Sequence, residues 1–374
     1  MAVIRALFAL AIFGLGAWAA LALYFGPLAS SVGAGVVAVS GVLAAASAAR
    51  RRGSWAPIGL FAVIFAGFLW VWSGVTPSNA RKWQSDVAVL PYATFDGDLV
   101  TLHNIRNFQY WTELDYTPSY YTKTFDLNQL DEVDMIAVYW MGDAIAHIMM
   151  SFGFADKDFV TISIETRKEE GESYDTVRGF FRNYELIYVV GDDRDLIRLR
   201  SNYRKNPPED VYLYRSRIPP ANARRLFLEY LRNVNELKEH PAFYNTGTTN
   251  CTTNIYRHTL VNPGEHPFSW KLMLSGYAPE YLYERGGLDS AVPFAEQKKR
   301  AHINPAAQAA DKAEDFSQRI RANLPKLPPL LSAGAPVPEP AAIPAPPVPA
   351  EAPAAAPAPA DAPAGAPAPP APPE

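Results

Sequence analysis

The sequence contains a single cysteine, Cys251, among its 374 residues. One cysteine cannot form a disulfide within the chain, so an exported domain would have to fold without that crosslink. The six histidines do not occur in close pairs and, with one cysteine, do not supply the ligands of a zinc site, so we expect no metal and no cofactor. A net charge of -4 also excludes the strongly basic surface of a nucleic-acid-binding protein.

Charged residues are missing from three stretches near the N-terminus, residues 6–25, 32–49 and 55–75. Each has close to the ~20 residues that a helix needs to cross the ~30 Å hydrocarbon core of a bilayer. The first stretch is longer than the apolar part of a cleaved signal peptide, and two more stretches follow it, so we expect it to be retained. Residues 1–82 are therefore predicted to form three transmembrane helices.

Basic residues set the predicted orientation of these helices. Arg5 precedes the first helix, and the arginines at 50–52 follow the second. Cytoplasmic loops carry an excess of basic residues, which places the N-terminus inside and directs the third helix outward. Arg81 and Lys82 then lie outside, against the rule, but they are outnumbered. The prediction is a multi-pass protein of the cytoplasmic (inner) membrane whose main domain is periplasmic.

The rest of the chain divides into a patterned region and a biased tail. Residues 83–330 are predicted to form an α+β domain, and residues 331–374, which are mostly proline and alanine, a disordered tail. Apolar alternation or short apolar runs predict strands at residues 98–105, 134–140, 145–154, 159–167, 185–190 and 211–214. Helical spacing predicts helices that begin near Pro219 and near Cys251, and a third helix over residues 306–324.

Two predicted strands bring a histidine and a carboxylate together. The turn between residues 153 and 158 is centred near Asp156, so opposed residues of an antiparallel hairpin have numbers that add up to 312. His147 and Glu165 meet that condition, and their Cβ atoms should lie roughly 4.5 to 5.5 Å apart. A carboxylate there can accept the imidazole N–H and stabilise the imidazolium ion. A register slip of one residue would move Glu165 to the other face.

Cys251 follows a Gly, Thr and Asn-rich segment, so it is predicted to lie in the first turn of a helix. The positive end of the helix dipole lowers the pKa of a thiol, and the first-turn N–H groups can bind an oxyanion. Beside His147, Cys251 would be an activated nucleophile with Glu165 as the group that orients the imidazole. The alternatives are a buried, inert cysteine and a hydrogen-bonded core histidine. His258 is two helical turns beyond Cys251 and therefore too far to be its base.

Aromatic residues gather between residues 110 and 121, among them Trp111, Tyr116 and Tyr120. They could form an apolar lip for a lipid substrate, or they could be ordinary core and turn residues.

The region from residue 83 to about residue 325 resembles a known family. The residues that carry the resemblance are 104–110 (NIRNFQY), 146–154 (AHIMMSFGF), 163–168 (SIETRK), 184–191 (YELIYVVG) and 250–254 (NCTTN). They are similar to the Lnb N-terminal periplasmic domain family. This resemblance implies a papain-like fold in permuted order, as in NlpC- and LRAT-like enzymes, with Cys251 as nucleophile, His147 as base and Glu165 as the third polar residue. The enzyme that gives the family its name is a lipoprotein transacylase.

These observations predict a membrane-anchored, thiol-dependent acyltransferase or hydrolase with a lipid or lipoprotein substrate. The sequence leaves two other functions open. A cysteine peptidase or amidase that cleaves cell-envelope peptides would use the same three residues. A non-enzymatic envelope scaffold would use none of them.

Overall fold

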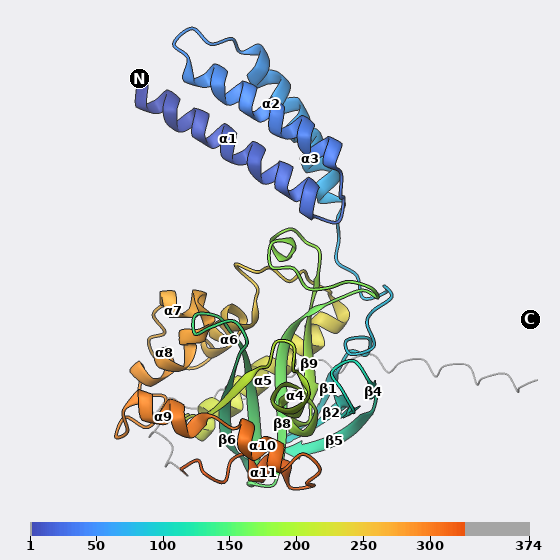
Figure 1. Cartoon of the computed structure of the whole chain (residues 1–374), viewed down its shortest axis with the longest axis vertical. Coiled ribbons are helices and arrows are strands. Elements are labelled where there is room, and N and C mark those ends of the chain that lie inside the picture. Colours follow the sequence, from blue (N-terminus) through green and yellow to red (C-terminus); the bar gives the residue numbers. More distant parts are fainter. Residues whose placement is uncertain (1, 326–374) are drawn as a thin grey trace, which may run out of the picture.

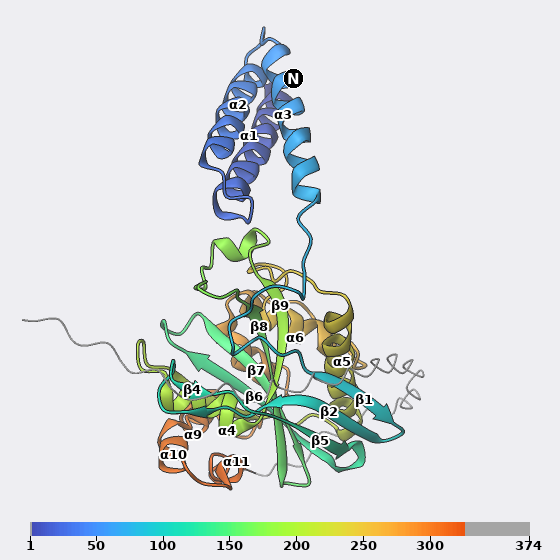
Figure 2. The same cartoon turned by 90° about the vertical axis from the view of Figure 1, so that its right-hand side faces the viewer.

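A computed structural model describes residues 2–325, so the predicted disordered tail at 331–374 lies outside the described residues. The described part has a three-helix bundle and a mixed α and β domain (Figures 1 and 2). The bundle consists of α1 (Ala2–Phe25), α2 (Ser31–Ala49) and α3 (Ala56–Ser73). All three helices are long and apolar enough to span a membrane. The α+β class and the three apolar helices are thus confirmed.

The domain is built on an eight-stranded sheet with the order β1-β2-β9-β8-β7-β6-β10, with β5 paired to β2. Apart from β2 and β9, whose one pair is parallel, the neighbouring strands are antiparallel. The strands are β1 (Tyr92–Asp96), β2 (Leu99–Arg106), β5 (Tyr120–Asp126), β6 (Leu130–Tyr139), β7 (Ala146–Phe154), β8 (Asp158–Arg167), β9 (Glu185–Gly191) and β10 (Asp210–Arg215). A separate hairpin pairs β3 (Gln109–Tyr110) with β4 (Tyr116–Thr117). All six predicted strands are present, whereas β1, β3, β4 and β5 were not predicted.

Helices cover both faces of the sheet. On one face packs α5 (Pro220–Glu239), and its predicted apolar stripe is entirely buried there: Ala223, Leu226, Phe227, Tyr230, Leu231, Val234 and Leu237. The opposite face is covered by α4 (Asp193–Arg198), α10 (Asn304–Ala309) and α11 (Phe316–Arg319). The remaining helices are α6 (Cys251–Thr259), α7 (Trp270–Met273), α8 (Ala278–Glu284) and α9 (Phe294–Ala301), with the short turns η1 (Leu127–Gln129), η2 (Arg178–Phe180), η3 (Leu199–Tyr203) and η4 (Ser275–Tyr277).

The predicted helix over residues 306–324 is wrong, because two short helices, α10 and α11, stand in its place. The chain breaks between them, and two groups of side chains, one from each side of the break, enter the same core. Ala307 and Ala310 pack into the core of this face, and Phe316 and Ile320 enter the same core after the break. One continuous helix over this length would carry the second group past the sheet at 1.5 Å per residue.

The loop between β8 and β9 joins the domain to the bundle. Phe181 packs with Phe25 and Trp72, and its ring centroid lies 6.4 Å from that of Phe25 in a stacked arrangement. Asn183 Nδ2 donates to the carbonyl of Phe25 at 2.5 Å, and an Arg182 guanidinium nitrogen donates to that of Trp72 at 3.1 Å. These bonds satisfy carbonyls at the ends of α1 and α3 that have no partner within their helices. The loop therefore fixes the domain against the end of the bundle.

Candidate functional site

Cys251 is the first residue of α6, as predicted, and is half-buried. Asn250 caps the helix: its side chain accepts the Thr253 N–H at 2.9 Å, while the Thr253 hydroxyl accepts the Asn250 N–H at 3.0 Å. This reciprocal pair fixes the start of the helix to the residue before the cysteine. The thiol therefore sits where the positive end of the helix dipole favours a thiolate.

His147 and Glu165 meet as the hairpin predicted. The ladder pairs Met149 with Ser163 and Met150 with Ile162, so opposed numbers add up to 312. Nε2 of His147 lies 3.1 Å from Oε1 of Glu165. It also lies 2.7 Å from Oγ of Ser163, whose hydroxyl donates to Oε1 of Glu165 at 2.7 Å. The predicted register is confirmed, and it places a carboxylate and a hydroxyl around one ring nitrogen.

The third predicted residue joins this pair. The Cys251 thiol lies close enough to His147 and to the backbone N–H of Ile148 for both to lower its pKa, and its Sγ lies 3.7 Å from Oγ1 of Thr252. Because Nε2 of His147 is engaged by Glu165 and Ser163, the ring nitrogen left for the thiol is Nδ1. The structure thus brings Cys251, His147 and Glu165 together in the order thiol, imidazole, carboxylate.

Burial and charge act on these three groups in opposite directions. Burial lowers the pKa of His147, but the Glu165 carboxylate and the bond to Cys251 outweigh it and raise that pKa to about 9. Burial raises the pKa of the Cys251 thiol, yet the hydrogen bond and charge of His147 bring it below its ordinary value. Burial also raises the pKa of Glu165, but His147 and Arg200 hold it well below its usual range. The combined shifts favour a thiolate–imidazolium pair with an ionised carboxylate behind it.

Arg200 is a member of the site that the sequence did not reveal. Its guanidinium donates to Oε1 of Glu165 at 2.8 Å and lies 3.4 Å from Glu209, which also pairs with Arg204 at 2.9 Å. Arg200 lies in η3, a π-helical turn, and such turns frequently occur at functional sites. No periodicity marks that segment, so nothing in the sequence connected it to Glu165. Ser163, by contrast, is two residues from Glu165 and could have been found from strand alternation alone.

Among the described residues, none of the other histidines has a hydrogen bond or ion pair with the thiol; each has a different partner. His258 is buried with its Nε2 2.6 Å from the Tyr188 hydroxyl, and burial lowers its pKa to about 4. Its ring centroid lies 4.4 Å from that of Tyr230. His103 lies 3.2 Å from Thr94, His240 pairs with Glu236, His266 contacts the Asn262 carbonyl, and His302 pairs with Asp210. Within residues 2–325 there is also no group of three or more His, Cys, Asp or Glu placed to hold a metal ion.

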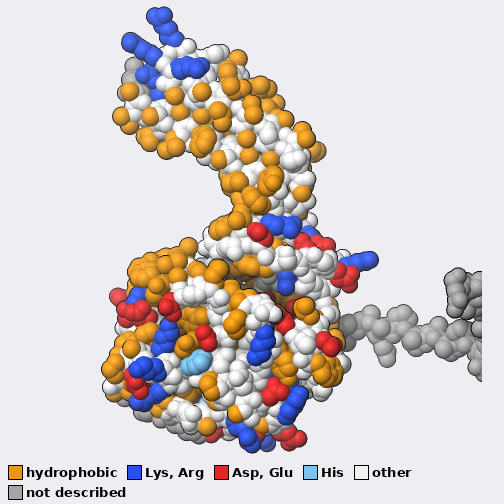
Figure 3. Space-filling model, viewed as in Figure 1, with side chains coloured by type: hydrophobic (Ala, Val, Ile, Leu, Met, Phe, Trp, Pro, Cys, Tyr) orange, Lys and Arg blue, Asp and Glu red, His pale blue; other side chains and the backbone are white. Residues whose placement is uncertain are grey.

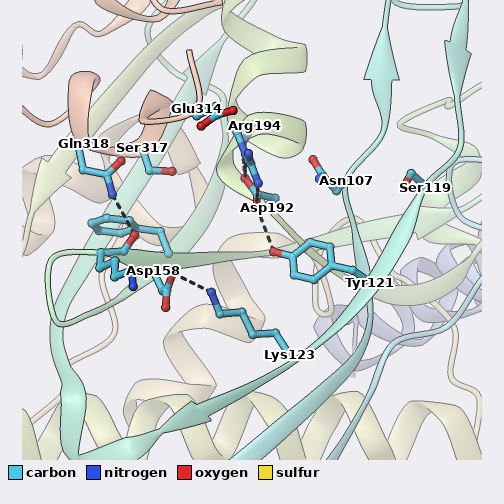
Figure 4. A pocket seen from close by; sticks show the side chains of 12 residues that line it. Asn107, Ser119, Tyr121, Lys123, Asp158, Asp192, Arg194, Glu314, Ser317 and Gln318 are labelled. Carbon is cyan, nitrogen blue, oxygen red and sulfur yellow. Dashed lines mark hydrogen bonds and ion pairs between the residues drawn. The ribbon is translucent and has the colours of Figure 1, made fainter. Parts of the chain in front are cut away.

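A polar pocket of about 340 Å³ lies elsewhere, at the turn end of the β7–β8 hairpin (Figure 4). Four of its charged side chains form two ion pairs: Lys123 lies 2.7 Å from Asp158, and Arg194 lies 3.0 Å from Asp192. None of the candidate catalytic residues lines it. The turn end of β7 is about 20 Å or more from its His147 end at ~3.3 Å per residue, so this pocket is separate from the thiol site.

Comparison with known families assigns the part of the chain that contains the site. Residues 116–276 match the model of the Lnb N-terminal periplasmic domain. This part of the chain belongs to the Lnb family. The matched residues of the Lnb domain include Cys251, His147 and Glu165, so the predicted resemblance is confirmed. The family match and the three candidate membrane-spanning helices together indicate a membrane protein with a periplasmic domain. No match was found among curated proteins or among solved structures.

The ionisation of the thiol can be measured directly, because iodoacetamide can alkylate only one cysteine in this chain. Glu165→Gln removes the charge that raises the pKa of His147 and leaves the positive charge of Arg200, which lowers that pKa, with only the Glu209 carboxylate beside it. The imidazolium becomes less stable, the thiol pKa rises, and the alkylation rate at pH 7 should fall about tenfold for each unit of that rise. Glu236→Gln is the control, because Glu236 pairs with the exposed His240. Equal rates in the two variants would contradict the proposed charge coupling.

Proposed function

We propose that this protein is a membrane-anchored, thiol-dependent acyltransferase or hydrolase that acts on lipid-linked substrates at the outer face of the cytoplasmic membrane. The observation that carries the proposal is the placement of His147 between the Cys251 thiol, whose pKa it lowers, and Glu165, whose Oε1 lies 3.1 Å from Nε2 of the imidazole. A nucleophile, a base and a group that orients the base are the parts that covalent acyl transfer requires.

The first half of the reaction forms an acyl-enzyme. The Cys251 thiolate adds to the carbonyl carbon of an ester or amide, and the negative charge that develops on the carbonyl oxygen faces the first-turn N–H groups of α6. When the tetrahedral intermediate collapses, the bond to the leaving alcohol or amine breaks. His147 gives its Nδ1 proton to that leaving group and becomes neutral.

The second half regenerates the enzyme. Neutral His147 removes a proton from water, an alcohol or an amine, whose oxygen or nitrogen then adds to the thioester carbon. Collapse of this second intermediate breaks the carbon–sulfur bond and restores the thiolate beside an imidazolium ion. Glu165, held ionised by Arg200, stabilises that imidazolium in the free enzyme, before and after each turnover. Water as the acceptor gives hydrolysis, and an alcohol or amine gives transfer.

The position of the site supports a lipid-linked substrate. The segment before Cys251 is bonded to the loop that contacts the bundle, because Thr246 N donates to the Gly179 carbonyl at 3.1 Å and Asn245 Nδ2 to that of Phe180 at 3.2 Å. Phe181, the next residue, packs against α1 and α3. The β8–β9 loop thus contacts both the segment that precedes Cys251 and the membrane helices. Confinement near the bilayer raises the effective concentration of a substrate anchored there.

We also propose the permuted papain-like fold and the boundaries 1–82, 83–330 and 331–374. In support of the fold, the strand that bears His147 precedes the helix that bears Cys251. For the membrane orientation we propose an N-terminus inside. The basic side chains of the bundle gather at the end remote from the domain (Figure 3), as expected if that end is cytoplasmic. A reporter fused after Trp83 that works only in the cytoplasm would contradict this orientation.

Trapping of the intermediate tests the proposed chemistry. The full chain, purified in detergent and given a chromogenic fatty-acid ester, should gain the mass of one acyl group on the peptide that contains Cys251. The adduct should be released by hydroxylamine, as thioesters are, and should be absent from Cys251→Ala. Turnover of the ester by Cys251→Ala at the parent rate would rule out the proposal. An adduct from a peptide amide but not from the fatty-acid ester would favour the peptidase alternative.

A further inference from the structure

A short helix next to the site buries its charged side chain and exposes its apolar ones. In α7, Lys271 is buried and its ammonium group lies 2.6 Å from Glu284 and 3.2 Å from Glu280. Its neighbours Trp270 and Met273 are instead 56% and 48% exposed. Soluble proteins normally keep a lysine in water and cover a tryptophan. A helix that does the opposite is arranged for an apolar environment on its outer side.

Five exposed apolar side chains lie in the segment of the chain between the end of α6 and the end of α7. We call this the α7 surface; its members are 40% to 59% exposed and are Leu260, Phe268, Trp270, Met273 and Leu274. In the space-filling view, apolar side chains gather over the position of α7 (Figure 3). Grouped exposed apolar residues of this kind mark a surface that contacts another apolar phase or a partner.

The α7 surface is held rigidly against the strand that carries His147. Ser275 Oγ accepts the N–H of Ala146 at 3.0 Å, and Gly276 N donates to the Ala144 carbonyl at 3.0 Å. A Cβ at Gly276 would lie 2.0 Å from the Asp143 carbonyl oxygen, so this close approach requires glycine. The α7 surface therefore cannot move independently of the site.

The bilayer is the occupant that fits the position of this surface. The outer ends of α1 and α3 meet the β8–β9 loop, where Val177 and Phe180 are also exposed, at 44% and 46%. From that point the bundle leans over the side of the domain that carries α7 and α8 (Figure 1). The helix of Cys251 begins beside the β8–β9 loop and leads at its far end into the α7 surface. Trp and Phe beside a charged pair are also typical of the membrane interface.

We propose that the α7 surface inserts into the outer leaflet of the bilayer that α1, α2 and α3 span. The domain would then have two apolar contacts with the membrane, the β8–β9 loop and the α7 surface, with α6 between them. The aromatic residues near 110–121, which the sequence offered as a lip, remain a separate prediction on which the α7 surface does not depend. Tyr110 is buried and Tyr116 stacks on Phe108, although Trp111 is exposed. This inference does not depend on the chemistry of Cys251.

A fluorescent label can report the depth of the α7 surface in a lipid nanodisc that holds one copy of the full chain. In a Cys251→Ala background, Met273→Cys carries an environment-sensitive dye, and Lys312→Cys, whose native side chain is 81% exposed, carries it as the control. Both substitutions are at exposed positions, so both variants should melt as the Cys251→Ala parent does. Nitroxide groups on the lipid acyl chains should quench the dye at 273 several-fold more than at 312, and aqueous iodide should do the reverse.

Two results would overturn the insertion. Quenching of the 273 dye by iodide to the same extent as the 312 dye would mean that the surface faces water. Protection of the 273 dye from both quenchers would mean that protein covers it. Neither result concerns acyl transfer, because the labelled variants lack the thiol, so failure here is distinguishable from failure of the proposed catalytic function.

Discussion

Cys251→Ser should abolish turnover of a chromogenic fatty-acid ester while the domain stays folded. Oxygen replaces sulfur with little change in shape, so the capped start of α6 is preserved. A hydroxyl is far less acidic than a thiol, and neither the helix dipole nor His147 can ionise it to a useful extent. We expect a loss on the order of 10⁴-fold or more in kcat, with an unchanged melting temperature.

His147→Ala should be about as severe, because among the described residues no other histidine has a recorded contact with the thiol. The double variant should be no worse than either single one, since residues that act as a unit fail together. His240→Ala is the control, because its side chain is 75% exposed and pairs only with Glu236 on its own helix. Full activity in Cys251→Ser would remove the catalytic proposal and favour the scaffold. Losses that multiply in the double variant would mean that the two residues act independently.

The largest effect on stability is expected from Arg321→Met. Arg321 is buried, and its guanidinium lies 2.8 Å from Asp134 and 2.6 Å from Asp193, two carboxylates that are also buried. Removal of one partner leaves charge without compensation in the core, which costs ~3–5 kcal/mol. Asp134 keeps Arg215 at 3.0 Å, but Asp193 keeps only the hydroxyls of Ser151 and Thr161. The melting temperature should fall by roughly 10 °C.

Arg319→Met is the matched control, two residues away. Its partner is Asp315, and both side chains are 57% exposed, so solvent screens this pair and its loss should change the melting temperature little. Thermal unfolding of the two full-length variants in the same detergent gives the comparison. Equal melting temperatures would mean that residue 321 is not part of the cooperative unit, and the proposed boundary at 330 would then be wrong.

Buried ion pairs join distant parts of the domain, which has no disulfide among the described residues. Arg200 and Glu209 fix Glu165 from one side of the sheet, and Arg321 ties α11 to β6 and α4. Each of these ions has several partners, which is the condition under which buried charge is tolerated. Such a network is stable in only one arrangement of its side chains, because displacement of one partner leaves its neighbour without a hydrogen bond or counter-charge.

The sequence by itself determined the features that depend on local chemistry. Three uncharged runs of membrane-spanning length, the apolar run of β7, the alternation in β8 and the cap before Cys251 are each short-range patterns. The pairing of His147 with Glu165 was predictable for the same reason, because a short hairpin turn fixes the register of the strands that it joins. The apolar stripe of α5 was equally visible, since helical spacing decides which side chains share a face.

Only the tertiary structure decided what comes from distant parts of the chain. Arg200 reaches Glu165 from a π-helical turn, and Arg321 reaches Asp134 across 187 residues. The break between α10 and α11 lets side chains from both of its sides enter one core. The burial of Lys271 in α7 was hidden as well, because four residues carry no measurable periodicity. In each case the deciding contact is long-range, so its energy belongs to the packed fold and leaves no trace in the local sequence.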